Sequence, residues 1–509
     1  MRRFAPACGL AVTLALAAAF VVVLSNSPEV MRALTNADLL LPVSFASDVI
    51  RHGAAARYFQ LPRVPSLVPD IGVVLLLEGM FGNWRLAMLG YAAAAFMALV
   101  TVGGAIAAQL AGRSLAIGTA TVLGLTVALL GVLWPTGTAG IYLLVLAPVI
   151  HSGPFVLALA ALLLARAAAQ REPRGGGRLV LLGAMAAAGT LSDKMFLGAF
   201  LPPLLAALGA SVWLNQMPYR PALRVAGVAL AGVALGWIAD RRLFAGLLLR
   251  QPDLALDWSD MPDRIGGFLR QPMLPYFAVA GLLVPLLPLL AWRRTPARVF
   301  WWTAIATTLP AFLGLAAILW VDDSSVRYMQ PVLWLPLFAV AGLLLTTPPV
   351  RRNTAALATA LVAALAGWVL LQPWPQPAIL AWRDPLAACL QQAHARGLLH
   401  DGLAGYWQAR PVEASTDWSL QVDQVTPNGN AYLWGNNRYW YGHARDDPRQ
   451  PPNTDFIVAA QLDASAVHKL YGAPATIMPC PGSEVWLYLP GHLHPVLRSV
   501  SPEALPPGL

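Results

Sequence analysis

Ionisable residues that interrupt long apolar runs are the first candidates for chemistry in this sequence. Asp38 follows the first apolar run, Asp193 and Lys194 separate two later runs, and Arg327 and Tyr328 precede another. His151 lies inside an apolar run. Charged groups at membrane depth are costly, and they usually face a cavity or a partner where they bind or move protons, ions or charged substrates.

Each of these residues also has a plain structural interpretation, and the sequence leaves both open. Asp193 and Lys194 could be a mutually neutralised pair that caps a tight turn. Asp322 and Asp323 could form a solvated helix end, and His151 is more often a packed, hydrogen-bonded histidine than a catalyst.

Several kinds of site lack their sequence signature. No two His or Cys residues stand at metal-ligand spacing beside a carboxylate, so no metal site is predicted and no cofactor is expected, although a divalent metal remains possible. Gly175-Gly176-Gly177 lacks the Lys-Ser/Thr of a nucleotide-binding P-loop and is interpreted as a flexible loop.

The composition is that of a membrane protein. Of the 509 residues, 57% are hydrophobic and 12% are charged, about half the charged fraction of a soluble domain. The net charge of +9 comes from short basic clusters between apolar runs, as in cytoplasmic loops, so nucleic-acid binding is not expected.

The apolar runs predict about eleven membrane spans. The first, residues 7–24, follows Met1-Arg2-Arg3 and could be a cleavable signal peptide, but an uncleaved span fits better because many spans follow. The other ten expected spans cover residues 86–110, 115–133, 141–165, 178–191, 195–215, 225–243, 273–291, 299–320, 331–346 and 354–371.

The arginine clusters predict the orientation. Four clusters, at residues 166–178, 220–224, 293–298 and 351–352, are placed in the cytoplasm by the positive-inside rule. Alternation then puts the N-terminus inside and everything after about Gln372 outside. We therefore expect a bacterial inner-membrane protein with a periplasmic C-terminus.

Two segments complete the organisation of the first module, residues 1–372. Residues 25–69 form a large first external loop, in which Phe45, Val49 and Ile50 share one face and predict a helix along the membrane surface. The apolar stretch 71–81 contains Glu78 and is too short to span, which favours a re-entrant segment.

Residues 373–509 form a separate soluble domain, predicted to be α+β. A Pro-rich linker opens it, and Asp384-Pro385 is typical of a helix start. Strands are expected at 420–425, 455–460 and 484–489. Cys389 and Cys480 could form a disulfide if the domain is exported, or remain two unpaired small residues.

With these features the chain resembles the GT-C class of membrane glycosyltransferases, which includes bacterial protein O-mannosyltransferases and aminoarabinose transferases. A first span followed by Asp38 and a long external loop is similar to that class, and so is Arg327-Tyr328-Met329-Gln330-Pro331 before an apolar span. The acidic residue is single here, and the re-entrant segment begins Val68-Pro69-Asp70 where many members have His-Pro-Pro.

The resemblance implies a sugar donor linked to polyprenyl phosphate, bound with its tail among the membrane lipids, and an acceptor that is a protein, lipid or glycan. Asp38 would be the catalytic base, with Asp48 or Asp70 as the next candidates. Arg327 and Lys194 would hold the phosphate, with Tyr328 beside them. Aromatic residues of the C-terminal domain, Tyr406 and Trp407 among them, could stack on sugars, but are more often core.

Two other classes of function remain open. A transporter or flippase of a lipid-linked substrate would usually show an internal repeat of broken helices, and no convincing repeat is visible. A non-catalytic cell-envelope assembly protein would use the external domain to bind a partner.

Overall fold

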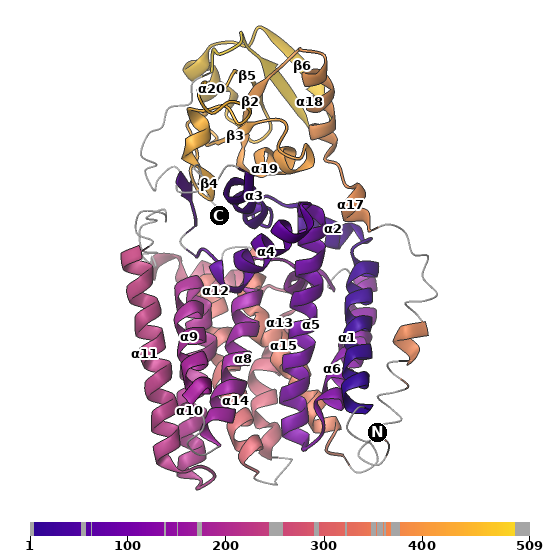
Figure 1. Cartoon of the computed structure of the whole chain (residues 1–509), viewed down its shortest axis with the longest axis vertical. Coiled ribbons are helices and arrows are strands. Elements are labelled where there is room, and N and C mark those ends of the chain that lie inside the picture. The colour runs from indigo at the N-terminus through magenta and orange to yellow at the C-terminus, as the bar shows by residue number, and fades with distance from the viewer. Residues whose placement is uncertain are drawn as a thin grey trace.

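The computed structural model describes residues 5–51, 58–62, 64–136, 139–149, 151–170, 176–243, 258–289, 295–320, 323–347, 353, 360, 363–367 and 377–493. These residues form a bundle of long helices topped by a smaller domain built on a sheet (Figure 1). The chain is thus a mostly helical protein with a C-terminal sheet domain.

Eight helices of the described residues are long and apolar enough to cross a membrane. They are α1 (Ala5–Leu24), α5 (Trp84–Ala111), α6 (Leu115–Leu133), α8 (Ser152–Ala169), α10 (Lys194–Trp213), α11 (Tyr219–Leu243), α14 (Pro296–Leu319) and α15 (Gln330–Leu344). Two shorter apolar helical segments, Gly176–Ser192 (α9) and Leu274–Leu286 (α13, η6 and part of η7), fall where spans were expected. Most of the expected span 354–371 lies outside the described residues.

One expected span has a different start. The sequence suggested a single span over 141–165, but the chain forms α7 (Ala139–Leu143) and η4 (Leu144–Leu146) and then breaks before α8. Ala147 is extended, as expected for a residue that precedes a proline, here Pro148. The break matters because it places His151 at the end of the bundle, directly before α8.

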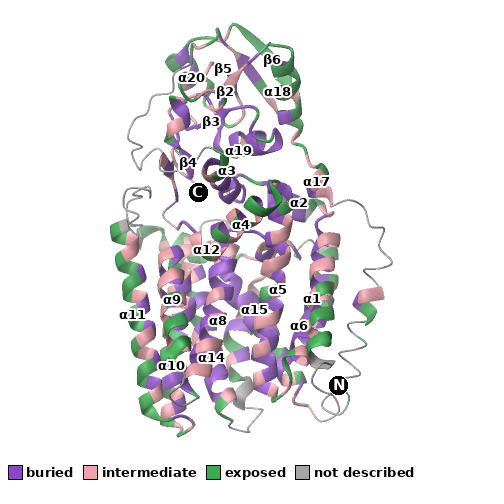
Figure 2. Cartoon of the chain, viewed as in Figure 1, coloured by how far each residue is buried: buried purple, intermediate pink, exposed green. Residues whose placement is uncertain are grey.

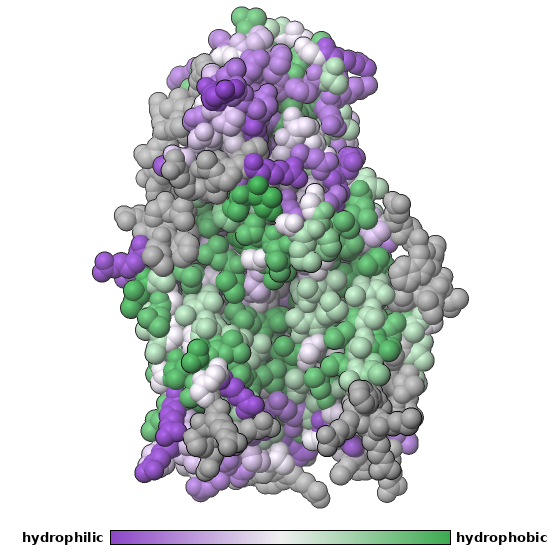
Figure 3. Space-filling model, in the orientation of Figure 1, coloured by the Kyte–Doolittle hydropathy of each residue, from purple (hydrophilic) through white to green (hydrophobic). Residues whose placement is uncertain are grey.

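The outer surface of the bundle suits lipid. Apolar side chains such as Val180 and Trp213 are 74% and 82% exposed, and apolar residues predominate over the middle of the molecule (Figure 3). Buried residues concentrate inside the bundle, whereas α11 at its edge is largely exposed (Figure 2). Large exposed apolar surfaces are rare on proteins that stay in water, so this belt indicates a membrane protein.

The first loop packs between the bundle and the sheet domain. It contains α2 (Pro28–Thr35), α3 (Leu41–Arg51), β1 (Phe59–Gln60) and the start of η2 (Leu67–Ile71). The stretch 71–81, expected to be a re-entrant segment, forms the short helix α4 (Gly72–Phe81). The surface helix expected around Phe45 is α3, but most of its residues are buried beneath the sheet domain. Phe45 itself packs edge-on against Phe59, with ring centroids 5.1 Å apart. The apolar face of α3 therefore packs against other parts of the protein and not against lipid.

The C-terminal domain has a five-stranded sheet in the order β3-β2-β5-β7-β6. β2 (Asp401–Gly405) pairs in parallel with β3 (Val422–Val425) and with β5 (Thr454–Val458), whereas β7 (Ser483–Leu487) is antiparallel to both β5 and β6 (Thr476–Cys480). Strands β3, β5 and β7 lie where the sequence predicted them.

Helices surround this sheet. α17 (Ala378–Ala381) leads into α18 (Pro385–Ala395), α19 (Tyr406–Ser415) connects β2 to β3, and α20 (Ala464–Tyr471) follows β5. α18 starts as expected, because the Asp384 carboxylate accepts hydrogen bonds from the backbone of Leu386 and Ala387. Cys389 of α18 and Cys480 of β6 form a disulfide.

Candidate functional site

Asp38 and Arg327 meet where the bundle touches the C-terminal domain. Oδ2 of Asp38 lies 3.8 Å from Nη1 of Arg327, and the two side chains are 18% and 29% exposed. Asp38 lies in the turn between α2 and α3, which the side chain of Asn36 stabilises by accepting a hydrogen bond from the backbone of Leu39. Arg327 comes from η8 (Asp323–Met329), between α14 and α15. The pair is therefore fixed by two separate loops and remains reachable.

The C-terminal domain also holds Asp38. The hydroxyl of Tyr406, the first residue of α19, donates a hydrogen bond to Oδ1 of Asp38. Burial and the nearby Asp38 carboxylate raise the pKa of Tyr406 well above its ordinary value, so the hydroxyl stays protonated and remains a donor. One turn later, Arg410 donates a hydrogen bond of 2.7 Å to the carbonyl of Ala37. These contacts fix the turn that carries Asp38.

Tyr328 links Arg327 to a histidine. The guanidinium carbon of Arg327 lies 5.3 Å from the centre of the Tyr328 ring, within the range of a cation–π contact. The His151 ring packs against the same tyrosine, with ring centroids 5.0 Å apart. The Tyr328 ring therefore contacts both Arg327 and His151.

His151 is oriented by a buried aspartate. Its Nδ1 lies 2.5 Å from Oδ2 of Asp193, whose side chain is fully buried, while the His151 side chain is 11% exposed. The contact engages Nδ1 and so fixes the orientation of the imidazole ring. His151 also has a left-handed backbone (φ 66°), which is uncommon for a side chain other than glycine.

Asp193 has two roles in this arrangement. Its Oδ1 accepts a hydrogen bond of 2.8 Å from the backbone of Met195 and so caps α10. The cap interpretation considered from sequence therefore holds, but the ionic partner of Asp193 is His151. The Lys194 side chain is exposed and its ammonium lies 5.5 Å from the centre of the Trp237 ring of α11.

Asp70 lies buried close to the same group. Its oxygens accept hydrogen bonds from the Tyr91 hydroxyl, at 2.7 Å, and from the Val149 backbone, at 2.9 Å. Burial raises the pKa of the Asp70 carboxyl to about 7, and the nearby charges of Asp193 and His151 act on it in opposite directions. Its packing is tight, because a Cβ at Gly153 would come within 1.7 Å of Oδ1 of Asp70.

Asp48 has a different environment. Its two oxygens accept hydrogen bonds from the Asn437 amide, at 2.8 Å, and from the Trp440 indole, at 3.0 Å. Both partners belong to the C-terminal domain, and Asp48 is 2% exposed. The structure thus places Asp48 in a contact between α3 and that domain, where both oxygens are already used.

Of the eight candidate site residues predicted from the sequence, six lie in one connected series of polar and aromatic side chains. Asp48 and Lys194 lie outside this series. The series runs through Asp38, Arg327, Tyr328, His151, Asp193 and Asp70. Tyr406, Arg410 and Tyr91 join them. Arg410 and Tyr91 were assigned no role from the sequence, and Tyr406 was considered only as a residue that could stack on sugars. Within the described part of the chain, no group of three or more His, Cys, Asp or Glu side chains could hold a metal ion.

Comparison with known proteins adds little to this geometry. No family model matches the chain, and no curated protein matches it. Among solved structures it is similar to the archaeal oligosaccharyltransferase AglB from Archaeoglobus fulgidus, solved with an inhibitory peptide and a dolichol-phosphate. The TM-score is 0.44 at 11% identity, over 88% of this chain and 69% of that one. A score this low does not establish a shared fold.

Proposed function

We propose that the chain is a membrane glycosyltransferase that moves a sugar from a polyprenyl-phosphate donor to an acceptor on the periplasmic face. The observation that carries the proposal is the Asp38–Arg327 pair at the junction of the lipid-facing bundle and the soluble domain. A donor with a long apolar tail and a polar head requires both environments at one point, and this junction provides them.

The pair suits the two demands of glycosyl transfer. A base must take the proton of the acceptor hydroxyl, and a cation must stabilise the departing phosphate. Asp38 is the base, while the guanidinium of Arg327 binds phosphate oxygens, for which its planar fork is well matched. In the transfer, the bond between the anomeric carbon and the phosphate oxygen breaks as the acceptor oxygen bonds to that carbon, and the acceptor proton moves to Asp38.

His151 and Asp193 extend the anion-binding side of this site. The Tyr328 ring contacts both Arg327 and His151, so His151 lies one aromatic residue away from the proposed phosphate-binding guanidinium. The contact with Asp193 orients the His151 ring. Asp70 supports the group through Val149, two residues before His151.

The orientation is part of the proposal. α1 rises from the N-terminal end of the bundle towards the sheet domain, and antiparallel neighbours then return to the far end (Figure 1). Arg166, Arg220 and Arg298 belong to ends of α8, α11 and α14 that lie away from that domain. Because cytoplasmic loops carry an excess of basic residues, we place these ends in the cytoplasm and the sheet domain and the site on the periplasmic face of the inner membrane.

A deletion strain tests the function. Its surface glycans and glycoproteins are profiled by mass spectrometry after complementation with wild type, Asp38→Ala or Arg327→Ala, at matched protein levels in the membrane. We expect a glycan to vanish in the deletion and to return with wild type alone. Asp260→Ala is the matched control, because the Asp260 side chain is 57% exposed at the start of α12 (Met261–Leu269). Full complementation by both site variants would favour an assembly protein or a transporter.

A further inference from the structure

A cavity in the C-terminal domain lies at the carboxyl ends of three parallel strands. It is lined by Gly405, the last residue of β2, by Val425, the last residue of β3, and by Gln461, which follows β5. The chain leaves β2 for β3 on one side and later reaches β5 on the other, so the strand order reverses at β2. In open sheets with parallel strands, ligands bind in the crevice at such a reversal.

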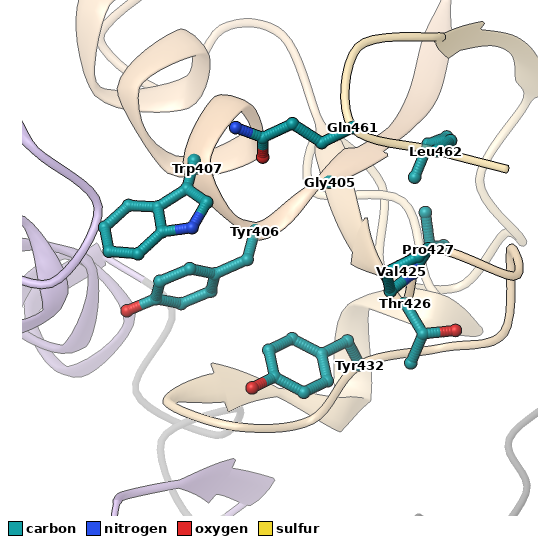
Figure 4. A pocket seen from close by; sticks show the side chains of 9 residues that line it. All are labelled: Gly405, Tyr406, Trp407, Val425, Thr426, Pro427, Tyr432, Gln461 and Leu462. Carbon is teal, nitrogen blue, oxygen red and sulfur yellow. The ribbon is translucent and has the colours of Figure 1, made fainter. Parts of the chain in front are cut away.

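The lining of the cavity suits a sugar ring. Nine residues line a volume of about 190 Å³, and none of them is charged. Tyr406, Trp407 and Tyr432 are its aromatic lining residues, and Thr426 and Gln461 carry its polar side-chain groups (Figure 4). Aromatic rings pack against the apolar face of a sugar, while a few polar groups orient its hydroxyls.

Trp407 is the residue most suited to receive a ligand. It is 38% exposed, although it is a large aromatic residue, and its ring packs edge-on against Tyr406 with centroids 5.0 Å apart. It lies in the first turn of α19, which no side chain caps, so backbone N–H groups there can donate to hydroxyl oxygens. In contrast, Tyr406 and Tyr432 are only 5% and 3% exposed, and both belong to one packed cluster behind Trp407.

The cavity and Asp38 lie against the same tyrosine. The Tyr406 ring lines the cavity, and its hydroxyl donates a hydrogen bond to the Asp38 carboxylate. A ring bound against Tyr406 and Trp407 would therefore hold the remainder of its own chain close to the proposed base.

We infer that this cavity is an acceptor subsite for a neutral saccharide. The inference rests on the proposed transferase and makes it more specific, because it names an oligosaccharide without acidic groups as the acceptor class. The saccharide is held by stacking on Trp407, with Tyr406 forming the wall behind it, and a hydroxyl of a neighbouring sugar unit is presented to Asp38. The uncharged lining disfavours acidic glycans, which would need a cationic partner.

Binding can be measured without turnover. Full-length protein in lipid nanodiscs is applied to an array of neutral hexose and N-acetylhexosamine oligosaccharides, with uronic-acid oligosaccharides printed beside them. We expect wild type to bind neutral oligosaccharides and Trp407→Ala to lose at least about ten-fold of that affinity, in keeping with loss of one aromatic contact. Trp213→Ala is the matched control, since Trp213 is 82% exposed on the bundle, and it should bind like wild type.

A second variant guards against misfolding. Gly405→Val fills the cavity at a residue with an ordinary backbone (φ −60°), and the added Cβ would meet the flexible Gln408 side chain at 3.0 Å. We expect it to lose binding while keeping the melting temperature of wild type. Binding of no glycan, binding of acidic glycans alone, or equal binding by wild type and Trp407→Ala would each overturn the inference. Wild type could bind neutral oligosaccharides on the array while its deletion leaves the cellular glycan profile unchanged. That result would support the saccharide subsite but contradict the proposed transferase.

Discussion

The hydroxyl of Tyr406, in the soluble domain, donates a hydrogen bond to Oδ1 of Asp38, in the first loop of the membrane bundle. The other oxygen of Asp38 faces Arg327 at 3.8 Å. The proposed base is thus held between a residue of the bundle and a residue of the C-terminal domain. The soluble domain therefore contributes a residue, Tyr406, to the candidate site.

Replacing Tyr406 by phenylalanine tests this relationship. The change keeps the ring in its packed environment but removes the hydrogen bond to a charged carboxylate, so we expect transfer to slow by about ten-fold or more. The measurement is the transfer rate of purified protein in nanodiscs, with the melting temperature recorded in parallel. Tyr439→Phe is the control, because the Tyr439 ring stacks on His443, a contact that phenylalanine retains. Equal rates for Tyr406→Phe and wild type would show that the hydroxyl does not act on Asp38.

Substitutions of Arg327 and Lys194 are expected to have opposite effects on the transfer rate. Arg327→Ala removes the cation beside Asp38, and we expect transfer to fall at least about a hundred-fold, with partial recovery in Arg327→Lys because a lysine keeps the charge without the planar fork. Lys194→Ala should keep nearly full activity, since Lys194 is exposed and packs on Trp237. The same transfer assay measures all three. A large loss in Lys194→Ala together with an active Arg327→Ala would reverse the assignment.

The sequence predicted most of the membrane bundle because length and apolarity determine a span. It also predicted three strands and the start of α18, where Asp384 caps the helix. It did not predict that α7 and η4 precede α8, since a continuous apolar run hides a break of this kind, although Pro148 marked it. The face around Phe45 was assigned to lipid because an apolar helix face does not reveal what covers it.

The candidate site was predicted less completely. Charge within an apolar run was a sufficient signal for Asp193 and His151, but their 2.5 Å contact depends on packing between α8 and the start of α10. Asp48 and Asp38 look alike in sequence. Only the structure shows that Asn437 and Trp440 donate hydrogen bonds to both oxygens of Asp48. Arg410 had no distinguishing pattern at all, because its partner is a backbone carbonyl far away in sequence.

Asp70 predicts a pH dependence of stability. Burial raises its pKa to about 7, against an ordinary value of 3.8. Between those two values the unfolded chain releases a proton that the folded chain retains, so stability falls as the pH rises from about 4 to about 7, by at most about 4 kcal/mol, and then levels off. In Asp70→Asn this contribution is absent. Melting temperatures from pH 5 to pH 8 should therefore decline less in the variant, and parallel curves would contradict the assignment.

The disulfide makes a prediction about stability and location together. Cys389→Ser opens a loop of 91 residues, and we expect it to lower the free energy of unfolding of the C-terminal domain by about 2–4 kcal/mol. Thermal melts report the loss, and Cys8→Ser is the control because Cys8 is a free, exposed cysteine. In wild-type cells, a thiol reagent should label Cys389 and Cys480 only after reduction, since an exported domain is oxidised. Labelling of both without reduction would place the domain in a reducing compartment.

The pool of lipid-linked sugars in the membrane tests the central claim most directly, because a transferase that cannot act leaves its donor unused. Lipid extracts of the deletion strain carrying wild type, Asp38→Asn or no copy are compared by mass spectrometry. We predict that one polyprenyl-phosphate sugar accumulates without the protein and with Asp38→Asn, and that it returns to its normal level with wild type. An unchanged pool in all three strains, or a normal pool with Asp38→Asn, would contradict a transferase that uses Asp38 as its base.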